Sequence, residues 1–419
     1  MKILIISQYF WPENFRINEI SHELSKLGNK VSVLTGMPNY PEGFFYKNFL
    51  KNKVSYAKYK NINILRVPIL QRRKNKFNLL LNYISFVLSS TIFGLFTIKK
   101  KEYDIIFVFQ TSPVFVGITS SIISITKDIP QIIWVLDIWP ETLISVGITN
   151  KYIINLVRKI VDKIYSYSFL VLAQSKSFVE NIKQYKSIKG NVFYFPVWSE
   201  FTLNLAKQKK AKEIKVKQNC FTIIFAGNIG EAQDFPTILN AIEYLSKKRF
   251  NDFRLLIIGD GRKKKWLIKN INERGLNSYV EIYKKFPLSR MPSIFLHGDA
   301  LLVSLSDQIA FNMTIPGKVQ TYLSTGLPIL GILNGEGANI IEEAGAGYTC
   351  NAGNYKDLAN LIIRLKNDSK ETRKKMGQRG KKFGESKFNK KKLIFKLNNI
   401  FKHVVIKKEV FTNIEYEKF

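Results

Sequence analysis

The sequence is poor in the residues that enzymes most often use to bind metals or to pair a nucleophile with a base. Its 419 residues include only two cysteines, Cys220 and Cys350, and three histidines, His22, His297 and His403. The cysteines lack metal-site spacing, and their scarcity favours a reducing cytosol with both thiols buried. The histidines show no ligand spacing, so neither a zinc site nor a Ser-His pair is expected.

Several phosphate-binding signatures are also missing. There is no P-loop sequence and no G-x-S-x-G elbow. Three G-x-G turns, at 259–261, 335–337 and 345–347, lack the third glycine of a dinucleotide fingerprint. No Asp-x-Asp pair is present, so the usual metal clamp for a nucleotide diphosphate is absent and no metal cofactor is expected. A bound diphosphate would have to be held by backbone N–H groups and cationic side chains.

Acidic residues are scarce relative to basic ones. The chain has 32 Asp and Glu against 65 Lys and Arg, a formal net charge of +33. Such an excess suggests an anionic partner, whether nucleic acid, an acidic membrane face or a phosphorylated ligand. The alternative is a lysine-rich composition without a specific partner. The opening MKILIISQYFWPEN lacks the longer apolar region and small-residue cleavage site of a signal peptide, and is expected to begin with a strand.

Short apolar runs alternate with helical patterns, such as Ile17–Leu27 and Pro236–Leu245, which predicts parallel sheets with helical crossovers. The predicted strands of the first half are Lys2–Ile6, Lys30–Thr35, Asp104–Phe109, Gln131–Leu136 and Ser168–Ala173. Those of the second half are Phe221–Phe225, Phe253–Ile258, Val280–Tyr283, Ala300–Ser304 and Pro328–Ile332. The length and a hydrophobic content of 46% suit two α/β domains. We therefore expect two doubly wound Rossmann-like domains, 1–198 and 219–390, joined by a polar Lys-rich linker at 199–218. A basic helix or tail at 391–419 would follow and would be free to pack back on the first domain.

Four glycine-containing segments of the second half follow predicted strands, where α/β domains place ligand loops. They are FAGNIGEAQDF (225–235), IIGDG (257–261), MTIPGKVQTYLSTGLPILG (313–331) and NGEGANIIEEAGAGY (334–348). Glycines in the first segment let backbone amides approach an anion, although ordinary βα loops share this pattern. Pro316 is expected as the first helical residue, with Lys318 in the first turn. Because a cation there opposes the helix dipole, its position suggests a phosphate nearby.

These segments, together with SQYFWPE, LTGMPNYPEG and DIWPE, resemble retaining GT-B glycosyltransferases of family 4, over roughly residues 1 to 400. The similarity is greatest to bacterial enzymes that transfer amino sugars such as N-acetylfucosamine in O-antigen and capsule assembly. The resemblance implies two domains facing across a cleft, with the nucleotide sugar bound by the second domain. The implied donor-binding residues are Gly227, Asn228, Ile229, Gly230, Glu231, Gly259, Asp260, Phe286, Arg290, Pro316, Gly317 and Thr321.

The sequence departs from the family in its charged residues. The Arg and Lys expected after the first strand of this domain read Asn228 and, nearby, Gln233 or Asp234. The two family glutamates, which have seven residues between them, fall on Met313 and Thr321. The cations left to meet a diphosphate are Lys318 and Arg290. Lys318, Glu336 and, in the first domain, Asp137 are the predicted catalytic residues.

The resemblance implies that the first domain binds the acceptor through its strand-end loops. The predicted acceptor-binding residues are Trp11, Asn14, Arg16, Asn39, Tyr40, Trp139 and Glu141. In the DIWPE loop, Trp139 is suited to stack on a sugar, while Asp137 and Glu141 are suited to accept from its hydroxyls. The alternative is that Trp139 fills the core and Asp137 caps a helix. Related enzymes often have His-Asp here, where this chain has Leu136-Asp137.

Residues 77–98 form an uncharged stretch long enough to cross a bilayer. Both flanks are basic, which gives no orientation, and Asn78, Asn82, Ser85 and Ser89 form a polar stripe at helical spacing. We expect a helix lying in the membrane surface with its apolar face down and its ends near anionic lipids. A buried helix and a true span are the alternatives.

The family resemblance and the helix at 77–98 together imply a glycosyltransferase peripherally attached to the cytoplasmic face of the cell membrane. It would transfer a sugar, such as an N-acetylated deoxy-amino sugar, from a UDP-sugar to a polyprenyl-diphosphate-linked glycan, with retention. Nucleotide sugar, lipid-linked acceptor and anionic membrane are the expected partners, without nucleic acid. The alternatives are a UDP-sugar 2-epimerase on the same fold and a basic nucleic-acid-binding protein, although Lys is spread over helices and tails rather than interleaved with aromatics.

Overall fold

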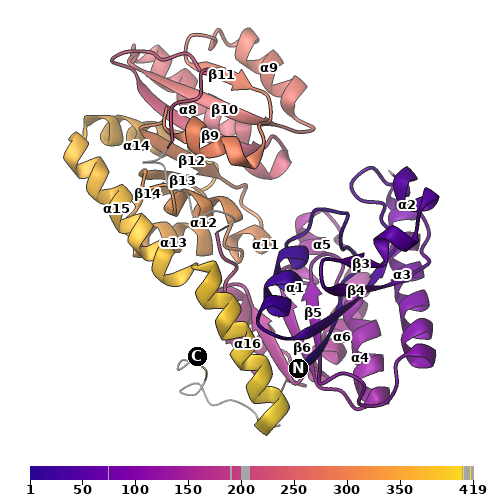
Figure 1. Cartoon of the computed structure of the whole chain (residues 1–419). Helices are drawn as coiled ribbons and strands as arrows, with labels where there is room; N and C mark the ends of the chain where they lie inside the picture. The colour runs from indigo at the N-terminus through magenta and orange to yellow at the C-terminus, as the bar shows by residue number, and fades with distance from the viewer. Residues whose placement is uncertain (74, 189–190, 200–207, 408, 410–415, 417–419) are drawn as a thin grey trace. The chain divides into compact units, whose positions relative to one another are not determined.

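The computed structural model describes residues 1–73, 75–188, 191–199, 208–407, 409 and 416 (Figure 1). The chain forms two compact units. The first comprises Met1–Phe195 together with Lys391–Phe419, and the second is the single run Pro196–Lys390. The predicted linker at 199–218 and the predicted tail at 391–419 lie partly outside the described residues.

The first unit is built on an eight-stranded sheet in the order β3-β4-β2-β1-β5-β6-β7-β8. Its strands are parallel except for β3, which pairs antiparallel with β4. They span β1 Lys2–Ile6, β2 Lys30–Gly36, β3 Lys58–Tyr59, β4 Ile62–Val67, β5 Ile105–Gln110, β6 Gln131–Val135, β7 Leu170–Ala173 and β8 Val192–Tyr194. Every residue of β5 and β6 is buried, as expected for central strands covered by helices on both faces.

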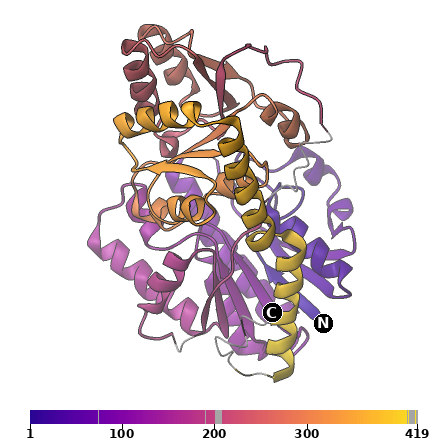
Figure 2. The same cartoon turned by 90° about the vertical axis from the view of Figure 1, so that its left-hand side faces the viewer.

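The helices of the first unit are α1 Arg16–Lys26, α2 Lys47–Lys51, α3 Lys76–Thr97, α4 Val116–Lys127, α5 Glu141–Ser145, α6 Lys151–Ser166 and α7 Lys176–Lys183, with a 3₁₀ turn at Val54–Tyr56. The last helix, α16 Lys390–Lys407, lies beside the amino-terminal strand in both views (Figures 1 and 2). Asn29 Nδ2 donates to Asn398 Oδ1 at 2.8 Å, and the ring of Phe401 lies 5.1 Å from that of Phe107. The end of the chain therefore completes the first unit.

The second unit has a six-stranded parallel sheet in the order β11-β10-β9-β12-β13-β14. Its strands are β9 Phe221–Asn228, β10 Phe253–Asp260, β11 Val280–Tyr283, β12 Ala300–Ser304, β13 Ile329–Ile332 and β14 Gly347–Cys350. Its helices are α8 Phe235–Lys247, α9 Lys264–Glu273, α10 Met291–Phe295, α11 Ile309–Asn312, α12 Gly317–Leu323, α13 Glu336–Glu343, α14 Tyr355–Asn367 and α15 Lys370–Lys387, with 3₁₀ turns at Glu231–Gln233 and Leu288–Arg290.

Both sheets reverse their strand order near the middle, so the prediction of two doubly wound α/β domains is confirmed. The order turns at β1 and β5 in the first sheet and at β9 and β12 in the second. All ten predicted strands are present. The sequence analysis missed β3, β4, β8 and β14, which lie at or next to sheet edges and carry weaker apolar patterns.

Candidate functional site

The four glycine segments of the second unit all follow strands β9, β10, β12 and β13 of the parallel sheet. Parallel strands end at one edge of a sheet, so these segments gather at the switch point between β9 and β12. Pairing of β9 with β10 continues to Gly227 opposite Gly259 and Asn228 opposite Asp260. The first two glycine turns therefore leave the sheet together.

Close backbone approach explains why these turns contain glycine. A Cβ on Gly259 would lie 1.9 Å from the carbonyl oxygen of Gly227, and one on Gly261 would lie 2.3 Å from that of Ile229. The amide of Ile229 donates to the carbonyl of Asp260 at 2.8 Å. Any larger residue at 259 or 261 would push the two turns apart, because the neighbouring atoms are backbone rather than flexible side chain.

Lys318 reaches into the first of these turns from the start of α12. A Cβ on Gly227 would meet Lys318 Cε at 2.5 Å and Nζ at 3.1 Å. The ammonium lies 4.0 Å from the ring centroid of Phe225 and donates to Oε1 of Gln233. Among the residues that the structure describes, no carboxylate forms an ion pair with it. Burial lowers the pKa of Lys318 to about 7, as expected for a cation withdrawn from water without a counter-ion.

The start of α12 differs by one residue from the prediction. Pro316 is the N-cap, with an extended ψ of 135°, and Gly317 is the first helical residue. Lys318 is therefore the second residue of the helix, still within its first turn. The hydroxyl of Thr321 donates to the carbonyl of Gly317 at 2.9 Å, so in this state it is engaged within its own helix.

Two residues missed by the sequence analysis, Tyr322 and Ser304, hold this region in place. The hydroxyl of Tyr322 accepts from the amide of Ala226 at 2.9 Å and donates to the carbonyl of the same residue at 3.2 Å. The carbonyl of Gln233 accepts from the hydroxyl of Ser304 at 2.6 Å. Tyr322 is 1% exposed and spans from α12 to the end of β9. Nothing in the sequence indicated that the hydroxyl of Tyr322 would hold the loop after β9.

The exposed part of the predicted donor site is made of polar side chains. The Asn228 amide lies over Gly230 and Gly261, where added Cβ atoms would stand 2.6 Å and 2.7 Å from it. Glu231 is paired with Lys263 at 2.7 Å. Asp260 is exposed, and its carboxylate accepts from the amide of Gly261 at 2.8 Å.

Glu336 begins α13, directly beside the start of α12. Gly335 takes a positive φ of 68°, and a Cβ on Gly337 would lie 2.9 Å from Cδ of Pro316. Glu336 itself is 5% exposed. The structure thus brings the segments carrying Lys318 and Glu336 together.

Two predicted donor residues lie on a separate segment. Phe286 is 9% exposed in the loop after β11. Arg290 ends the following 3₁₀ turn, and its guanidinium donates to both carboxylate oxygens of Glu213 at 2.6 and 2.8 Å. Glu213 therefore already compensates the positive charge of Arg290. Among the described residues, no contact joins Arg290 to Lys318. Lys318 is the only one of the two predicted cations without a carboxylate partner among the described residues.

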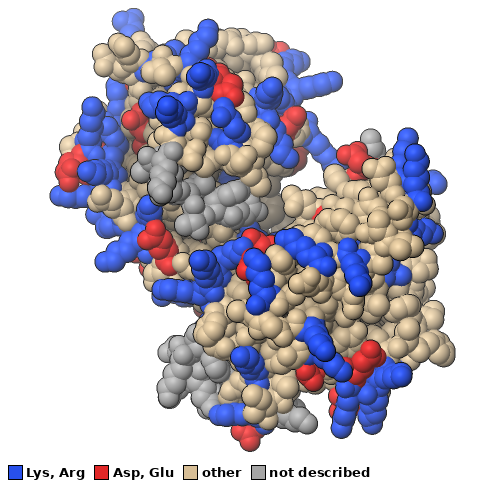
Figure 3. All heavy atoms as spheres, in the orientation of Figure 1, with Lys and Arg blue, Asp and Glu red and all other residues tan. Residues whose placement is uncertain are grey.

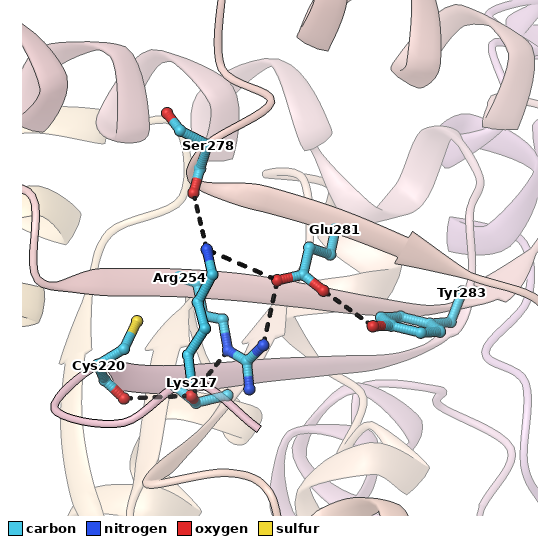
Figure 4. A network of polar contacts seen from close by, with 7 residues as sticks. Lys217, Cys220, Arg254, Ser278, Glu281 and Tyr283 are labelled. Atoms are coloured by element: carbon cyan, nitrogen blue, oxygen red, sulfur yellow. Dashed lines mark hydrogen bonds and ion pairs between the residues drawn. The ribbon is translucent and has the colours of Figure 1, made fainter. Parts of the chain in front are cut away.

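A second polar network lies at the opposite end of the sheet (Figure 4). Arg254, which is 1% exposed, pairs with Glu281 at 3.1 Å and donates to the hydroxyl of Thr222 at the same distance. Lys217 lies 3.9 Å from Glu281, and the hydroxyl of Tyr283 donates to Glu281 at 2.8 Å. Arg254, Thr222 and Glu281 stand near the amino ends of their strands, away from the glycine turns. This network fastens the segment before β9 to the sheet.

In the first unit, the loop after β1 is organised by Glu13, which the sequence analysis did not single out. Its carboxylate accepts from the amides of Asn39 at 2.8 Å, Tyr40 at 2.7 Å and Phe10 at 3.3 Å. Burial raises the pKa of Glu13 to about 7, although the backbone hydrogen bonds oppose this shift. Glu13 therefore clamps the SQYFWPE loop to the LTGMPNYPEG loop.

The predicted acceptor residues of these loops differ in their accessibility. Asn39 is fully buried and serves the loop itself, since its Oδ1 accepts from the amide of Arg72 at 3.2 Å. Trp11 is half-buried and stacks on Tyr56, with ring centroids 5.0 Å apart. The ring of Tyr40 lies 5.0 Å from the Arg72 guanidinium. Among the other predicted residues, Asn14 is exposed and Arg16, which begins α1, is half-buried.

The DIWPE loop follows β6 and is directed inward. Trp139 is 6% exposed, and its indole donates to the hydroxyl of Ser112 at 3.3 Å. The ring therefore fills the interior, as in the alternative left open by the sequence. The Asp137 carboxylate accepts from the hydroxyls of Ser112 and, at 3.4 Å, Thr142. Burial raises the pKa of Asp137, and the helix that follows is capped by Pro140 rather than by Asp137.

Glu141 begins α5 and is 8% exposed. One carboxylate oxygen accepts from Asn181 Nδ2 at 3.3 Å, while the other is buried without a hydrogen-bond partner. Such a group costs free energy unless a ligand or water satisfies it. Within the described ranges, no three His, Cys, Asp or Glu side chains gather as a metal site.

Comparisons with known proteins agree with this geometry. Residues 206–383 match the family model of "Glycosyl transferases group 1", which covers the strands and loops that carry Lys318. The chain is 22% identical over 301 residues to "Probable glycosyltransferase WbjE" of Pseudomonas aeruginosa, covering 69% of this chain and 73% of the relative. It is 24% identical over 346 residues to "Putative colanic acid biosynthesis glycosyl transferase WcaI" of Escherichia coli K12, covering 78% and 82%.

A similar solved structure is that of Anabaena HepE in complex with UDP and glucose. It superposes with a TM-score of 0.67 at 16% identity, over 96% of this chain and 99% of the other. At this identity the match shows the fold alone. The predicted GT-B fold is thereby confirmed.

Proposed function

Because the chain is a glycosyltransferase of GT-B fold, similar to proteins of polysaccharide biosynthesis, we propose that it uses a UDP-sugar as donor. The sugar would pass, with retention, to a polyprenyl-diphosphate-linked glycan at the cytoplasmic face of the cell membrane, in O-antigen or capsule assembly. An N-acetylated deoxy-amino sugar such as N-acetylfucosamine is the donor sugar that the family resemblance favours. The choice of UDP in this proposal is supported by the similar HepE structure, which is a complex with UDP and glucose.

The observation that carries this proposal is the position of Lys318. Its ammonium lies at the glycine turn after β9 without a carboxylate partner among the described residues. In the GT-B fold this edge of the second sheet is where ligands bind, outside the carboxyl ends of the strands. A diphosphate here would supply the missing counter-charge and restore the ordinary pKa of the lysine.

Leaving-group stabilisation follows from the same arrangement. As the bond between the sugar and the diphosphate breaks, negative charge grows on the phosphate oxygens. Lys318 and the amides of Gly230 and Glu231 would stabilise that charge without reorganising, because the turns are already fixed by Tyr322 and by the pairing of β9 with β10. This accounts for the absence of the family Arg-Lys pair.

The acceptor hydroxyl need not be deprotonated by a side chain in such a retaining reaction, since a departing phosphate oxygen can take the proton. The DIWPE loop of the first unit would orient the acceptor through Asp137 and Glu141. The unpartnered oxygen of Glu141 and the raised pKa of Asp137 both indicate carboxyl groups that gain from a polar ligand.

The test is a transfer assay with Lys318→Met. Wild-type protein is incubated with a panel of UDP-sugars and a polyprenyl-diphosphate-linked saccharide, and the product anomer is assigned by NMR. We expect transfer with retention, and a loss of about 100-fold or more in turnover for Lys318→Met. The matched control is Lys366→Met, because Lys366 also lies over a phenylalanine ring, at 4.5 Å from Phe250, yet pairs with Asp252.

Two outcomes would contradict the proposal. Near-normal turnover in Lys318→Met would remove the diphosphate role of this residue. Epimerised sugar released from a UDP-sugar without any acceptor would instead support a 2-epimerase on the same fold.

A further inference from the structure

Helix α3 presents a polar, small-residue face to the first unit. Asn82 is fully buried, and its Oδ1 accepts from Gln8 Nε2 at 2.8 Å. The hydroxyl of Ser90 lies 2.8 Å from that of Thr119 on α4. A Cβ on Gly94 would stand 2.3 Å from Cδ1 of Ile123, so α3 and α4 pack closely along this face. The polar stripe seen in the sequence therefore contributes to the contact with the protein.

The opposite face of α3 is apolar and open. Its exposed fractions are high for large hydrophobic side chains: Phe77 68%, Leu80 47%, Ile84 43%, Leu88 59%, Ile92 57% and Phe96 88%. These six residues, three or four apart, form one continuous stripe, the α3 apolar face. A helix on the surface of a water-soluble domain has the reverse arrangement, with its apolar stripe turned inward.

Basic residues predominate around this face. Residues 43–101 contain thirteen Lys and Arg but no Asp or Glu. Figure 3, in the orientation of Figure 1, shows a largely uncharged expanse on the side where α3 lies, with Lys and Arg gathered at its upper and lower ends and a few acidic side chains at the lower end. An anionic bilayer matches both properties, because its core accepts the apolar stripe and its headgroups attract the cations.

By length and composition, the segment Phe77–Thr97 would also suffice to cross a membrane. Crossing would require α3 to leave α4, which would remove the contact of Ser90 with Thr119 and strip the buried Asn82 amide of its partners Gln8 and Leu70 inside lipid. Unsatisfied polar groups in a hydrocarbon core cost several kcal/mol each. A position along the membrane surface keeps these hydrogen bonds and still removes the α3 apolar face from water.

We infer that the α3 apolar face is the surface by which this protein docks on an anionic bilayer. The helix lies parallel to the membrane plane, with its apolar side chains among the acyl chains and the neighbouring cations at the headgroups. This inference deepens the proposed function and rests on it for the lipid-linked acceptor, since it names the surface that would bring the active site to that substrate. Docking itself requires neither donor nor acceptor.

The test measures binding of the full-length protein to vesicles by co-sedimentation, without substrates. Vesicles of phosphatidylcholine alone are compared with vesicles containing 30% phosphatidylglycerol (about this fraction supplies a negative surface potential). The variant is Leu88→Gln with Ile92→Gln, and the control is Leu156→Gln with Ile268→Gln. The control pair is likewise one Leu and one Ile: Leu156 on α6 is 60% exposed and Ile268 on α9 is 42% exposed.

We expect the α3 variant to bind the anionic vesicles at least about tenfold more weakly than wild type, since two large apolar side chains no longer enter lipid. The control should bind like wild type, and binding should weaken with added salt and without phosphatidylglycerol. All four substituted side chains are exposed, so circular dichroism and UDP binding should be unchanged.

Unchanged vesicle binding of the α3 variant, or equal loss in the control, would overturn the inference. Protein that resists extraction by alkaline carbonate would also overturn it, because that result indicates a span. Glycosyl transfer to a detergent-soluble acceptor is assayed in parallel. If transfer fails in wild type while docking still depends on α3, the proposed function fails and the docking surface stands.

Discussion

Gly227 and Lys318 lie so close that a methyl group on the glycine would stand 2.5 Å from the lysine Cε. Gly227 has a φ of 149°, in a region that L side chains rarely adopt. The glycine therefore permits both the turn after β9 and the approach of the ammonium to it. The first two predictions below concern this pair, and the other two concern the Arg254–Glu281 ion pair and Asp137.

Gly227→Ala should lower donor affinity and turnover by about tenfold or more, because the added methyl group displaces Lys318 from the turn. Gly353→Ala is the matched control. It has a φ of 80° and open space around its Cβ, so it shares the backbone strain without the contact. The two variants are compared by their UDP affinity, measured by calorimetry, and by their rates of sugar transfer. Equal effects in both variants would mean that backbone strain, rather than the position of Lys318, accounts for the loss.

Donor binding should depend on pH through Lys318. Its pKa is lowered from 10.5 to about 7, so between these values the lysine is neutral in the folded protein and charged in the unfolded one. Without ligand, this residue therefore disfavours folding below pH 7, and that cost is relieved as the pH rises from 7 to 10.5. A bound diphosphate favours the charged form, so UDP affinity should fall as the pH rises above 7.

Calorimetry in buffers of different ionisation enthalpy measures this linkage. At pH 8, UDP binding should take up close to one proton, about the neutral fraction of a lysine with a pKa near 7. Lys318→Met should take up none, and Lys366→Met should behave like wild type. Proton uptake that persists in Lys318→Met would assign the linkage to another group.

Removing either partner of the Arg254–Glu281 ion pair should lower the free energy of unfolding, but by different amounts. Glu281→Ala leaves the Arg254 guanidinium buried without its counter-ion and should cost about 3 kcal/mol. Arg254→Met replaces the charge with an apolar side chain and leaves only a partly exposed carboxylate, so it should cost less. Urea unfolding measures both values. UDP affinity should not change in either variant, because this network lies at the amino ends of the strands.

Asp137→Asn should reduce transfer by about tenfold or more while UDP binding stays unchanged, because Asp137 belongs to the first unit. The amide keeps the shape of the carboxylate but loses its charge. Asp128→Asn, on an exposed residue after α4, is the control. A rise in KM for the lipid-linked acceptor, with turnover preserved, would assign Asp137 to binding alone.

Sequence periodicity predicted the central strands because buried parallel strands are continuous apolar runs. Strand β4, next to a sheet edge, and the edge strand β14 were missed because a half-exposed strand carries mixed side chains. Glycine turns and Lys318 could be recognised as a group, since their positions after strands imply a common sheet edge. The roles of Glu13 and Tyr322 could not be recognised in the sequence, because both depend on contacts with residues distant in the chain. Glu13 accepts from the amides of another loop, and the Tyr322 hydroxyl joins α12 to β9.

The sequence alone determined two α/β domains, a cluster of glycine turns with one lysine after the strands of the second domain, and a long uncharged helix between basic flanks. The tertiary structure decided which cation lacks a counter-ion: Arg290 is paired with Glu213, whereas Lys318 lies at the turn beside Gly227. It also decided which face of α3 is open. Spacing along a helix defines a polar and an apolar stripe, but only packing against Gln8 and α4 turns the polar stripe inward and leaves the apolar one exposed.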